Sequence, residues 1–216
     1  MRRAVIIAGG QIEEDFCLAY IERYAFEHKV AVDFGLEFFY HTGIKPDRIV
    51  GDFDSVDSKA LSFFEKQGQT EWLRLIPEKD DTDTEAALRG LIREGYEEIH
   101  ILGGIGSRLD HTLGNIELLG IGLMMGVRIF LVDSHNRIRM IREGITISRK
   151  EQYGDYISLL PFTPQVTGIT LTGMKYPLTD YTMVCYTTIG ISNEIVAEEG
   201  KISLKDGILL MFETKD

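Results

Sequence analysis

The sequence predicts an α/β protein, with a parallel-sheet, Rossmann-like domain over residues 1–136 and a small all-β sandwich domain over residues 137–216. Two observations predict the first domain: short apolar runs alternate with segments of helical periodicity, and the connections between them are short. A third predicts the second domain. After residue 137 the helical spacing disappears, and β-prone runs are separated by Gly, Pro, Asp and Asn.

Composition indicates a globular chain with a substantial core and excludes two kinds of partner. Apolar residues make up 44% of the 216, and 23 basic against 34 acidic residues give a net charge of −11. Without a basic block, nucleic acid is not an expected partner. No run approaches the roughly 20 apolar residues of a membrane span, so no membrane partner is expected. Cys17 and Cys185 lack metal or disulfide spacing, which predicts two buried thiols in a cytoplasmic protein.

Each apolar run of the first domain is expected to be a buried strand followed by a loop and a helix. The predicted strands are residues 3–8, 29–32, 48–50, 72–76, 98–102 and 128–132. The predicted helices are 13–27, 36–41, 58–66, 83–93 and a segment from the end of the loop at His111 to about Met125. The single tryptophan, Trp72, is assigned to the core. The β-prone runs of the second domain are 138–141, 146–148, 156–160, 167–171, 181–186, 195–197, 201–204 and 208–212.

Two acids, Asp52 and Asp54, follow the strand at 48–50. Carboxylates at i and i+2 of an extended strand face opposite sides, so they share one site only if the strand has already broken into a turn. Mg²⁺ takes one or two carboxylates together with waters or phosphate oxygens, and this loop can supply them. The alternative is a polar, well-capped connection.

A second acidic segment, KDDTD at 79–83, follows the fourth strand. In the functional interpretation Asp80 and Asp83 join the earlier acids around Mg²⁺, and Lys79 offers positive charge to a phosphate. In the structural alternative the acids favour the dipole of a first helical turn, and Thr82 with Glu85 forms a capping box.

The loop GGIGSRLDH at 103–111 follows the fifth strand. Its glycines favour backbone amides around phosphate oxygens, although it is neither a Walker A loop nor a complete GxGxxG. Arg108 beside the glycines suits bidentate contact with a phosphate. His111 is either a proton carrier or a hydrogen-bonded structural residue. With Asp33 and Asp133, these loops all follow the carboxyl ends of strands, where open parallel sheets bind ligands.

Taken together, the segments resemble the thiamine pyrophosphokinase (thiamine diphosphokinase) family. GDFDS at 51–55, after GIKPDRIV at 43–50, is similar to the family signature. KDDTDTEAAL at 79–88 and GGIGSRLDHTLGN at 103–115 resemble its second and third motifs, and GISNE at 190–194 resembles the Ser-Asn motif of its C-terminal domain. The resemblance spans about residues 30–197.

The resemblance implies transfer of pyrophosphate from ATP, the co-substrate, to the hydroxyethyl group of thiamine, with Mg²⁺, by a homodimer with sites between subunits. The implied metal ligands are Asp52 and Asp54 with at least one of Asp80 and Asp83, and the implied catalytic residues are Asp54, Asp80, Asp83 and Arg108. The implied nucleotide contacts are Asp33, Lys79, Thr82, Gly104, Gly106, Ser107, Arg108, Asp110 and His111. Ser192 and Asn193 are implied to contact thiamine.

The chain departs from the family pattern in two places. DFGLE at 33–37 stands where the family often has DGGAN, and GMKYPL at 173–178 lacks the Trp-Asn pair that commonly follows the Lys. Two other functions therefore stay open. One is a kinase or pyrophosphohydrolase acting on another small alcohol or nucleotide. The other is a nucleotide-sensing module without turnover, against which the four acids argue.

Overall fold

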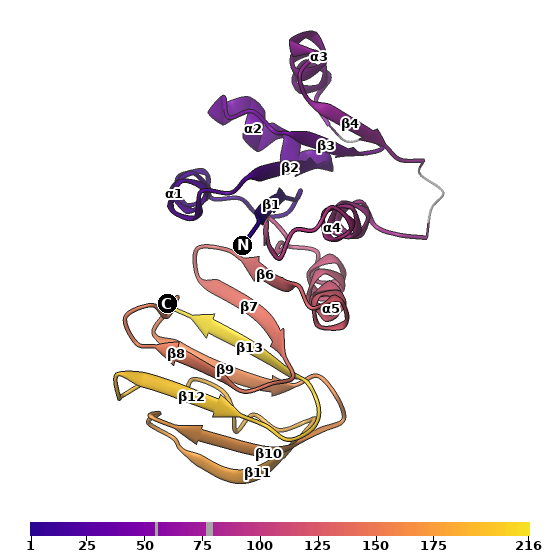
Figure 1. Ribbon diagram of the computed structural model, residues 1–216. Helices are drawn as coiled ribbons and strands as arrows, with labels where there is room; N and C mark the ends of the chain where they lie inside the picture. Colours follow the sequence, from indigo (N-terminus) through magenta and orange to yellow (C-terminus); the bar gives the residue numbers. More distant parts are fainter. Residues whose placement is uncertain (55, 77–79) are drawn as a thin grey trace. The chain divides into compact units, whose positions relative to one another are not determined.

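The computed structural model describes residues 1–54, 56–76 and 80–216. The chain divides into two compact units, Met1–Ser134 (unit 1) and His135–Asp216 (unit 2), coloured indigo to rose and rose to yellow in Figure 1. The predicted α/β architecture with a smaller all-β part is confirmed. Among the helices in the described ranges, none combines the length and the apolar character needed to cross a membrane.

Unit 1 contains a parallel sheet in the order β4-β3-β2-β1-β5-β6, in which each neighbouring pair is parallel. Its inner strands are almost entirely buried, as expected of continuous apolar runs covered on both faces. The strands are β1 (Arg3–Ile7), β2 (His28–Val32), β3 (Arg48–Gly51), β4 (Glu71–Arg74), β5 (Glu98–Leu102) and β6 (Arg128–Val132).

The helices of unit 1 connect these strands and cover both faces of the sheet. They are α1 (Glu14–Tyr24), α2 (Leu36–Thr42), α3 (Ser58–Gln67), α4 (Asp83–Arg93) and α5 (Leu109–Met125), with a 3-10 turn at Asp33–Gly35. Figure 1 shows α4 and α5 across the sheet from α1 and α2, as right-handed crossovers require. Because the strand order reverses between β1 and β5, the carboxyl ends of these two strands flank the switch point where such sheets bind ligands.

Two predicted helix boundaries and one burial prediction are wrong. Helix α1 ends at Tyr24 rather than at residue 27, because Ala25 adopts a left-handed φ of 46°. Helix α5 begins at Leu109, so the segment up to His111 is its first turn and not the end of a loop. Cys17 is buried, and burial first, with the charge of Glu13 second, raises the pKa of its thiol to about 12. Cys185 is only half-buried.

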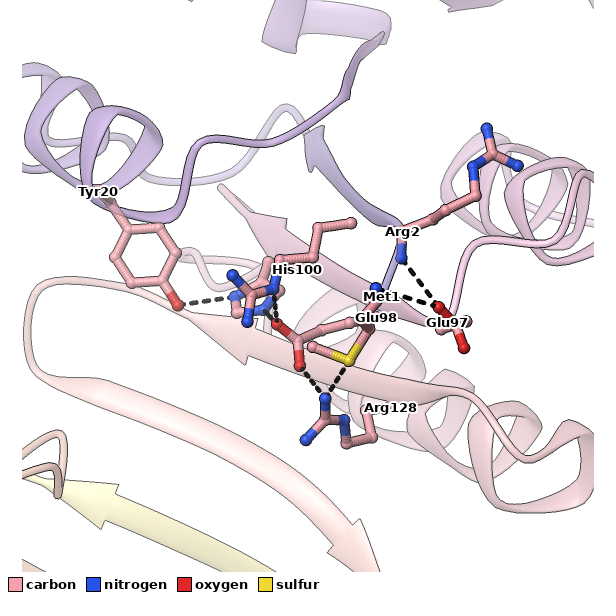
Figure 2. A network of polar contacts seen from close by, with 8 residues as sticks. Met1, Arg2, Tyr20, Glu97, Glu98, His100 and Arg128 are labelled. Carbon is pink, nitrogen blue, oxygen red and sulfur yellow. Dashed lines mark hydrogen bonds and ion pairs between the residues drawn. The ribbon is translucent and has the colours of Figure 1, made fainter.

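A buried polar network joins β5 to its neighbours (Figure 2). Glu98 and His100 lie two residues apart on β5 and therefore on one face of the sheet. His100 Nε2 lies 3.2 Å from Glu98 Oε1, and its Nδ1 lies 2.7 Å from the hydroxyl of Tyr20 on α1. Arg3 of β1 and Arg128 of β6 each form an ion pair of 2.8 Å with the same carboxylate. The network ties helix α1 and three central strands together.

Unit 2 consists of two antiparallel sheets around one apolar core. One contains β7, β13 and β9, and the other has the order β11-β10-β12-β8. The strands are β7 (Asn136–Ile141), β8 (Ile145–Ser148), β9 (Tyr156–Pro161), β10 (Gln165–Thr172), β11 (Leu178–Val184), β12 (Glu199–Ser203) and β13 (Leu209–Thr214). The core draws Ile141, Leu159, Met211, Ile169, Met183 and Ile202 from both sheets.

The predicted strand at 195–197 is wrong. Ile195 forms only an isolated bridge with Met174, although its side chain is 3% exposed and belongs to the core. The apolar run there is short, and Ile195 is buried from a loop that packs against the core rather than from a strand.

Candidate active site

The loops at the switch point are bonded directly to each other. Gly10 donates its backbone N–H to Gly103 O at 2.7 Å, and Gln11 donates to Ile105 O at 2.8 Å. A Cβ on Gly10 would lie 2.4 Å from Gly103 O, so only glycine permits this approach. The loop after β1 therefore belongs to the same edge as the glycine loop after β5. Sequence reasoning did not include Gly10 or Gln11 in the site, although the glycine pair ending the first strand was a visible signal.

The ends of β2 and β3 meet at Asp33. This residue has a φ of 47°, and its Oδ1 would lie 2.1 Å from a Cβ built on Gly51. The absence of a side chain at Gly51 thus makes room for the Asp33 carboxylate immediately before the Asp52-Phe53-Asp54 segment. Asp33 is half-buried, and the structure places it beside the first acidic loop.

Asp52 and Asp54 lie in a turn and not in an extended strand. Phe53 between them has a φ of 65°, and the backbone N–H of Asp54 donates to Asp52 Oδ1 at 3.2 Å. The two acids could share one site only if the strand had already broken into a turn, and this is so. The left-handed Phe53 breaks the alternation of side chains between them. Asp52 is half-buried and Asp54 is exposed.

The left-handed conformation of Phe53 costs about 1–2 kcal/mol. The Phe53 ring, 6% exposed, contacts the Trp72 ring edge to face, with centroids 5.4 Å apart at 81°. The guanidinium carbon of Arg74 lies 5.4 Å from the Phe53 centroid and 5.3 Å from that of Trp72. An aromatic pair and a cation–π contact each contribute about 0.5–1.5 kcal/mol, which is enough to offset the strain.

The assignment of Trp72 to the core is wrong. It lies on β4, the edge strand, where no residue is fully buried, and its own side chain is half-buried. A single aromatic residue in an apolar run does not reveal whether its strand is central or at an edge, because that depends on the strand order.

The second acidic segment leads into α4. Thr82 is the N-cap, and its Oγ1 accepts from Glu85 N at 3.2 Å, which confirms this half of the predicted capping box. The Glu85 carboxylate lies 2.6 Å from Arg89 Nη2. Asp83 occupies the first turn, half-buried, and Asp80 is exposed just before it. Lys79, predicted to contact phosphate, lies outside the described residues.

The predicted metal ligands do not form a closed cage. Within residues 1–54, 56–76 and 80–216, no three His, Cys, Asp or Glu side chains are arranged to hold a metal ion, and no three of the four predicted acids do so. Mg²⁺ bound with a nucleotide needs only one or two carboxylates, since phosphate oxygens and waters complete its shell. Asp52 and Asp54 lie two residues apart in one turn, and Asp33 lies beside Gly51 just before it; this set of acids fits that open kind of site.

The glycine loop after β5 is held by the first turns of α5. Thr112 Oγ1 accepts from Gly106 N at 3.2 Å, and Asn115 Nδ2 donates to Gly104 O at 2.7 Å. Gly104 is buried, and a Cβ there would lie 2.4 Å from Leu131 Cδ1. The structure thus gives Gly104 a packing role. The supports Thr112 and Asn115 were missed, although both lie within the motif at 103–115.

Arg108 and Asp110 form an exposed ion pair at the start of α5. Arg108 reaches Asp110 Oδ2 at 2.7 Å and Oδ1 at 3.3 Å, and their side chains are 70% and 66% exposed. The hydrogen bond from Arg108 lowers the pKa of Asp110 to about 2. Asp110 therefore stays ionised near neutral pH and pairs with the Arg108 guanidinium at the start of α5. Ser107 and His111 are exposed beside the pair.

In unit 2 the predicted substrate residues differ in character. Asn193 is 6% exposed; its Oδ1 accepts from Tyr176 N at 3.0 Å, and its Nδ2 donates to Tyr176 O at 2.8 Å. Ser192 is exposed, with a φ of 56°, and its backbone N–H donates to Ser158 Oγ at 2.9 Å. Asn193 thus fixes the segment around Tyr176, and Ser192 is an exposed residue next to it.

Both units match known family models. Residues 23–131 match the model described as "Thiamin pyrophosphokinase, catalytic domain", and residues 144–209 match "Thiamin pyrophosphokinase, vitamin B1 binding domain". The chain is also 34% identical over 218 residues to the thiamine pyrophosphokinase of Bacillus subtilis, covering 100% of both chains. The chain belongs to the thiamine pyrophosphokinase family.

Solved structures agree with this assignment. The crystal structure of the B. subtilis thiamine pyrophosphokinase superposes with a TM-score of 0.89 over 100% of both chains, at 34% identity. The thiamin pyrophosphokinase of Geobacillus thermodenitrificans gives 0.86 at 30% identity, covering 99% of this chain and 98% of that one. Both units of the chain match thiamine pyrophosphokinases. The alternative functions, a different kinase, a pyrophosphohydrolase or a nucleotide sensor, are therefore not favoured.

Proposed function

We propose that this thiamine pyrophosphokinase transfers the pyrophosphoryl group of ATP to the hydroxyethyl oxygen of thiamine at the carboxyl edge of the unit 1 sheet, giving thiamine diphosphate and AMP. The observation that carries the location is the turn at Asp52-Phe53-Asp54, which lies beside Asp33 at the ligand-binding edge of the sheet. The match of unit 2 to a vitamin B1 binding domain supports thiamine as the acceptor.

Asp52, Asp54, Asp80 and Asp83 are proposed to hold Mg²⁺ together with phosphate oxygens of ATP. When bound, the ion neutralises charge on the phosphates and on the pyrophosphoryl group as it transfers. A chain with a net charge of −11 would otherwise repel the nucleotide from a cluster of acids. Asp54 or Asp80 is proposed to take the proton of the thiamine hydroxyl, although a loose transition state makes little demand on a base.

The remaining unit 1 residues are proposed to orient the nucleotide. Arg108, held by Asp110, offers its guanidinium to a phosphate, and Ser107 and His111 lie beside it on the exposed rim. The other proposed nucleotide contacts are Asp33, Lys79, Thr82, Gly104 and Gly106. The amide of Gly106 already donates to Thr112, so its contact with phosphate would be shared.

In unit 2, Ser192 is proposed to contact thiamine through its exposed hydroxyl, and Asn193 to act by holding Tyr176. Tyr176 is 57% exposed and lies in the altered segment 173–178. An aromatic face at that position can stack on a flat cationic ring, which is the chemistry that the commonly present Trp would supply.

Ligand-dependent unfolding temperatures test this proposal. Mg²⁺ with ATP, and separately thiamine diphosphate, should each raise the unfolding temperature by about 5–10 °C at 100 times their dissociation constants. ATP in the presence of EDTA should give a much smaller shift, because the acids then face the phosphates without a cation. No shift with either thiamine or thiamine diphosphate would contradict the substrate assignment.

We also propose a cytoplasmic homodimer with sites between subunits. Unit 2 exposes a set of large apolar side chains on and after β11: Val184, Tyr186, Ile189 and Ile191 are 44–106% exposed. Its two sheets also leave edge strands that a second copy can cover. The free thiols of Cys17 and Cys185 are those expected in a reducing compartment. Sedimentation at micromolar concentration should give a dimer, and a fully active monomer would contradict both the dimer and the shared site.

A further inference from the structure

The spacing of Asp52 and Asp54 depends on a single strained residue. Phe53 has a φ of 65°, a conformation that an L-residue with a bulky side chain avoids. If Phe53 returned to an extended conformation, Asp52 and Asp54 would point to opposite sides of the chain. The hydrogen bond from Asp54 N to Asp52 Oδ1 would then be lost. Whatever holds Phe53 therefore also holds the turn in which Asp52 accepts a hydrogen bond from the backbone of Asp54.

The contacts that hold Phe53 come from the edge strand β4. Arg74 lies directly opposite Gly51 in the β3–β4 register, and the N–H of Leu75 donates to Gly51 O at 3.0 Å. The rings of Trp72 and Phe53 pack edge to face, with their centroids 5.4 Å apart. The Arg74 guanidinium lies over both rings. β4 contributes no acid of the predicted metal cluster. Its residues Trp72 and Arg74 nevertheless contact Phe53 in the turn between Asp52 and Asp54.

Arg74 is itself fixed in this position. Its Nη2 lies 2.6 Å from Glu65 Oε1 on α3, so its charge is balanced within the protein. The guanidinium is thus bonded at one end and stacked on two rings. These contacts give Arg74 a supporting role at the turn.

We infer that Trp72 and Arg74 are positioning residues, which keep Phe53 in its left-handed conformation so that Asp52 and Asp54 present their oxygens together to Mg²⁺ and the nucleotide. The inference rests on the proposed function of this loop. It assigns a role in the reaction to two residues outside the set proposed to bind the metal and the nucleotide. It also explains why the only tryptophan lies half-buried at a sheet edge.

The test compares Trp72→Ala with the conservative Trp72→Phe and with Leu73→Ala, a neighbour on the same strand that is 38% exposed. Two quantities are measured for each: the Mg²⁺ concentration for half-maximal activity at fixed ATP, and the rise in unfolding temperature that Mg²⁺ with ATP produces. Trp72→Ala should raise the half-maximal Mg²⁺ concentration about 10-fold and reduce the ligand-induced rise, with the KM for thiamine within about twofold. Trp72→Phe and Leu73→Ala should behave as the wild type.

Arg74→Ala provides a second variant, since the Arg74 side chain is 60% exposed and its loss leaves the core intact. It should shift the Mg²⁺ dependence in the same direction as Trp72→Ala. A purely structural role would lower the unfolding temperature and leave the Mg²⁺ dependence unchanged, and that result in either variant would overturn the inference. Failure of the proposed function would appear separately, as wild-type protein that forms no thiamine diphosphate.

Discussion

Replacing Asp54 with asparagine should lower kcat at least about 100-fold while the fold is retained. Asp54 is exposed in the turn after β3, so the substitution removes charge without disturbing the core. Its carboxylate is proposed to hold Mg²⁺ on the nucleotide, and an amide binds the ion less well and cannot accept a proton. Initial rates at saturating Mg²⁺, together with the unfolding temperature, measure both parts of the expectation.

Asp155→Asn is the matched control for this variant. Asp155 is an exposed acid in unit 2 outside the proposed site, so the same change of charge should leave kcat within about twofold of the wild type. Near-normal turnover of Asp54→Asn at saturating Mg²⁺ would show that the acidic turn is not part of the metal site.

Replacing Glu98 with glutamine should destabilise unit 1 by about 3 kcal/mol, because it breaks a buried ion pair and leaves the positive groups around it uncompensated. The Glu98 side chain is 6% exposed, and its oxygens lie 2.8 Å from both Arg3 and Arg128 (Figure 2). The side chains of Arg3 and Arg128 are 38% and 53% exposed and can turn toward water. The loss of stability should therefore lie at the lower end of the range for breaking a buried ion pair. Urea unfolding followed by Trp72 fluorescence measures unit 1 specifically.

The pH dependence of this loss has a definite sign. Burial alone would raise the pKa of Glu98, but the hydrogen bond and charge of His100 and the charges of Arg128 and Arg3 outweigh it, so the pKa lies below its ordinary value of 4.5. The stability that Glu98 contributes is therefore complete above pH 4.5 and is lost as pH falls through the lowered pKa. The difference between the wild type and Glu98→Gln should shrink over that acid range.

Glu97→Gln is the control for Glu98. Glu97 is adjacent in sequence but 61% exposed, and its ion pair with the N-terminus is 3.7 Å long. Exposed pairs of this kind contribute about 0–1 kcal/mol, so the control should change stability by no more than that at any pH. Equal effects of the two variants would contradict the assigned importance of the buried network.

Much of the fold was predictable because its signals are local. Continuous apolar runs marked the buried strands of unit 1, and Thr82 marked the start of α4 through its cap. The end of α1 was not predictable, because the left-handed Ala25 carries no sequence signal of the kind that glycine gives. The false strand at 195–197 shows the same limit, since a buried loop and a short strand have similar apolar patterns.

For the site, sequence reasoning located the loops but not their mutual supports. The spacing of Asp52 and Asp54 required a turn, and the structure contains one. The contact of Gly10 with Gly103, the packing of Trp72 on Phe53 and the use of Asn193 to hold Tyr176 all join segments distant in the chain. Such contacts depend on the strand order, which periodicity does not reveal.

Product analysis with ATP, thiamine and Mg²⁺ tests the central claim most directly, because it identifies which phosphorus is attacked. Nucleotides and thiamine esters are separated by ion exchange after partial turnover. Attack on the β-phosphorus, with the pyrophosphoryl group transferred as one unit, predicts AMP and thiamine diphosphate in equal amounts and no AMP when thiamine is omitted. Thiamine-dependent formation of ADP and thiamine monophosphate would contradict the account.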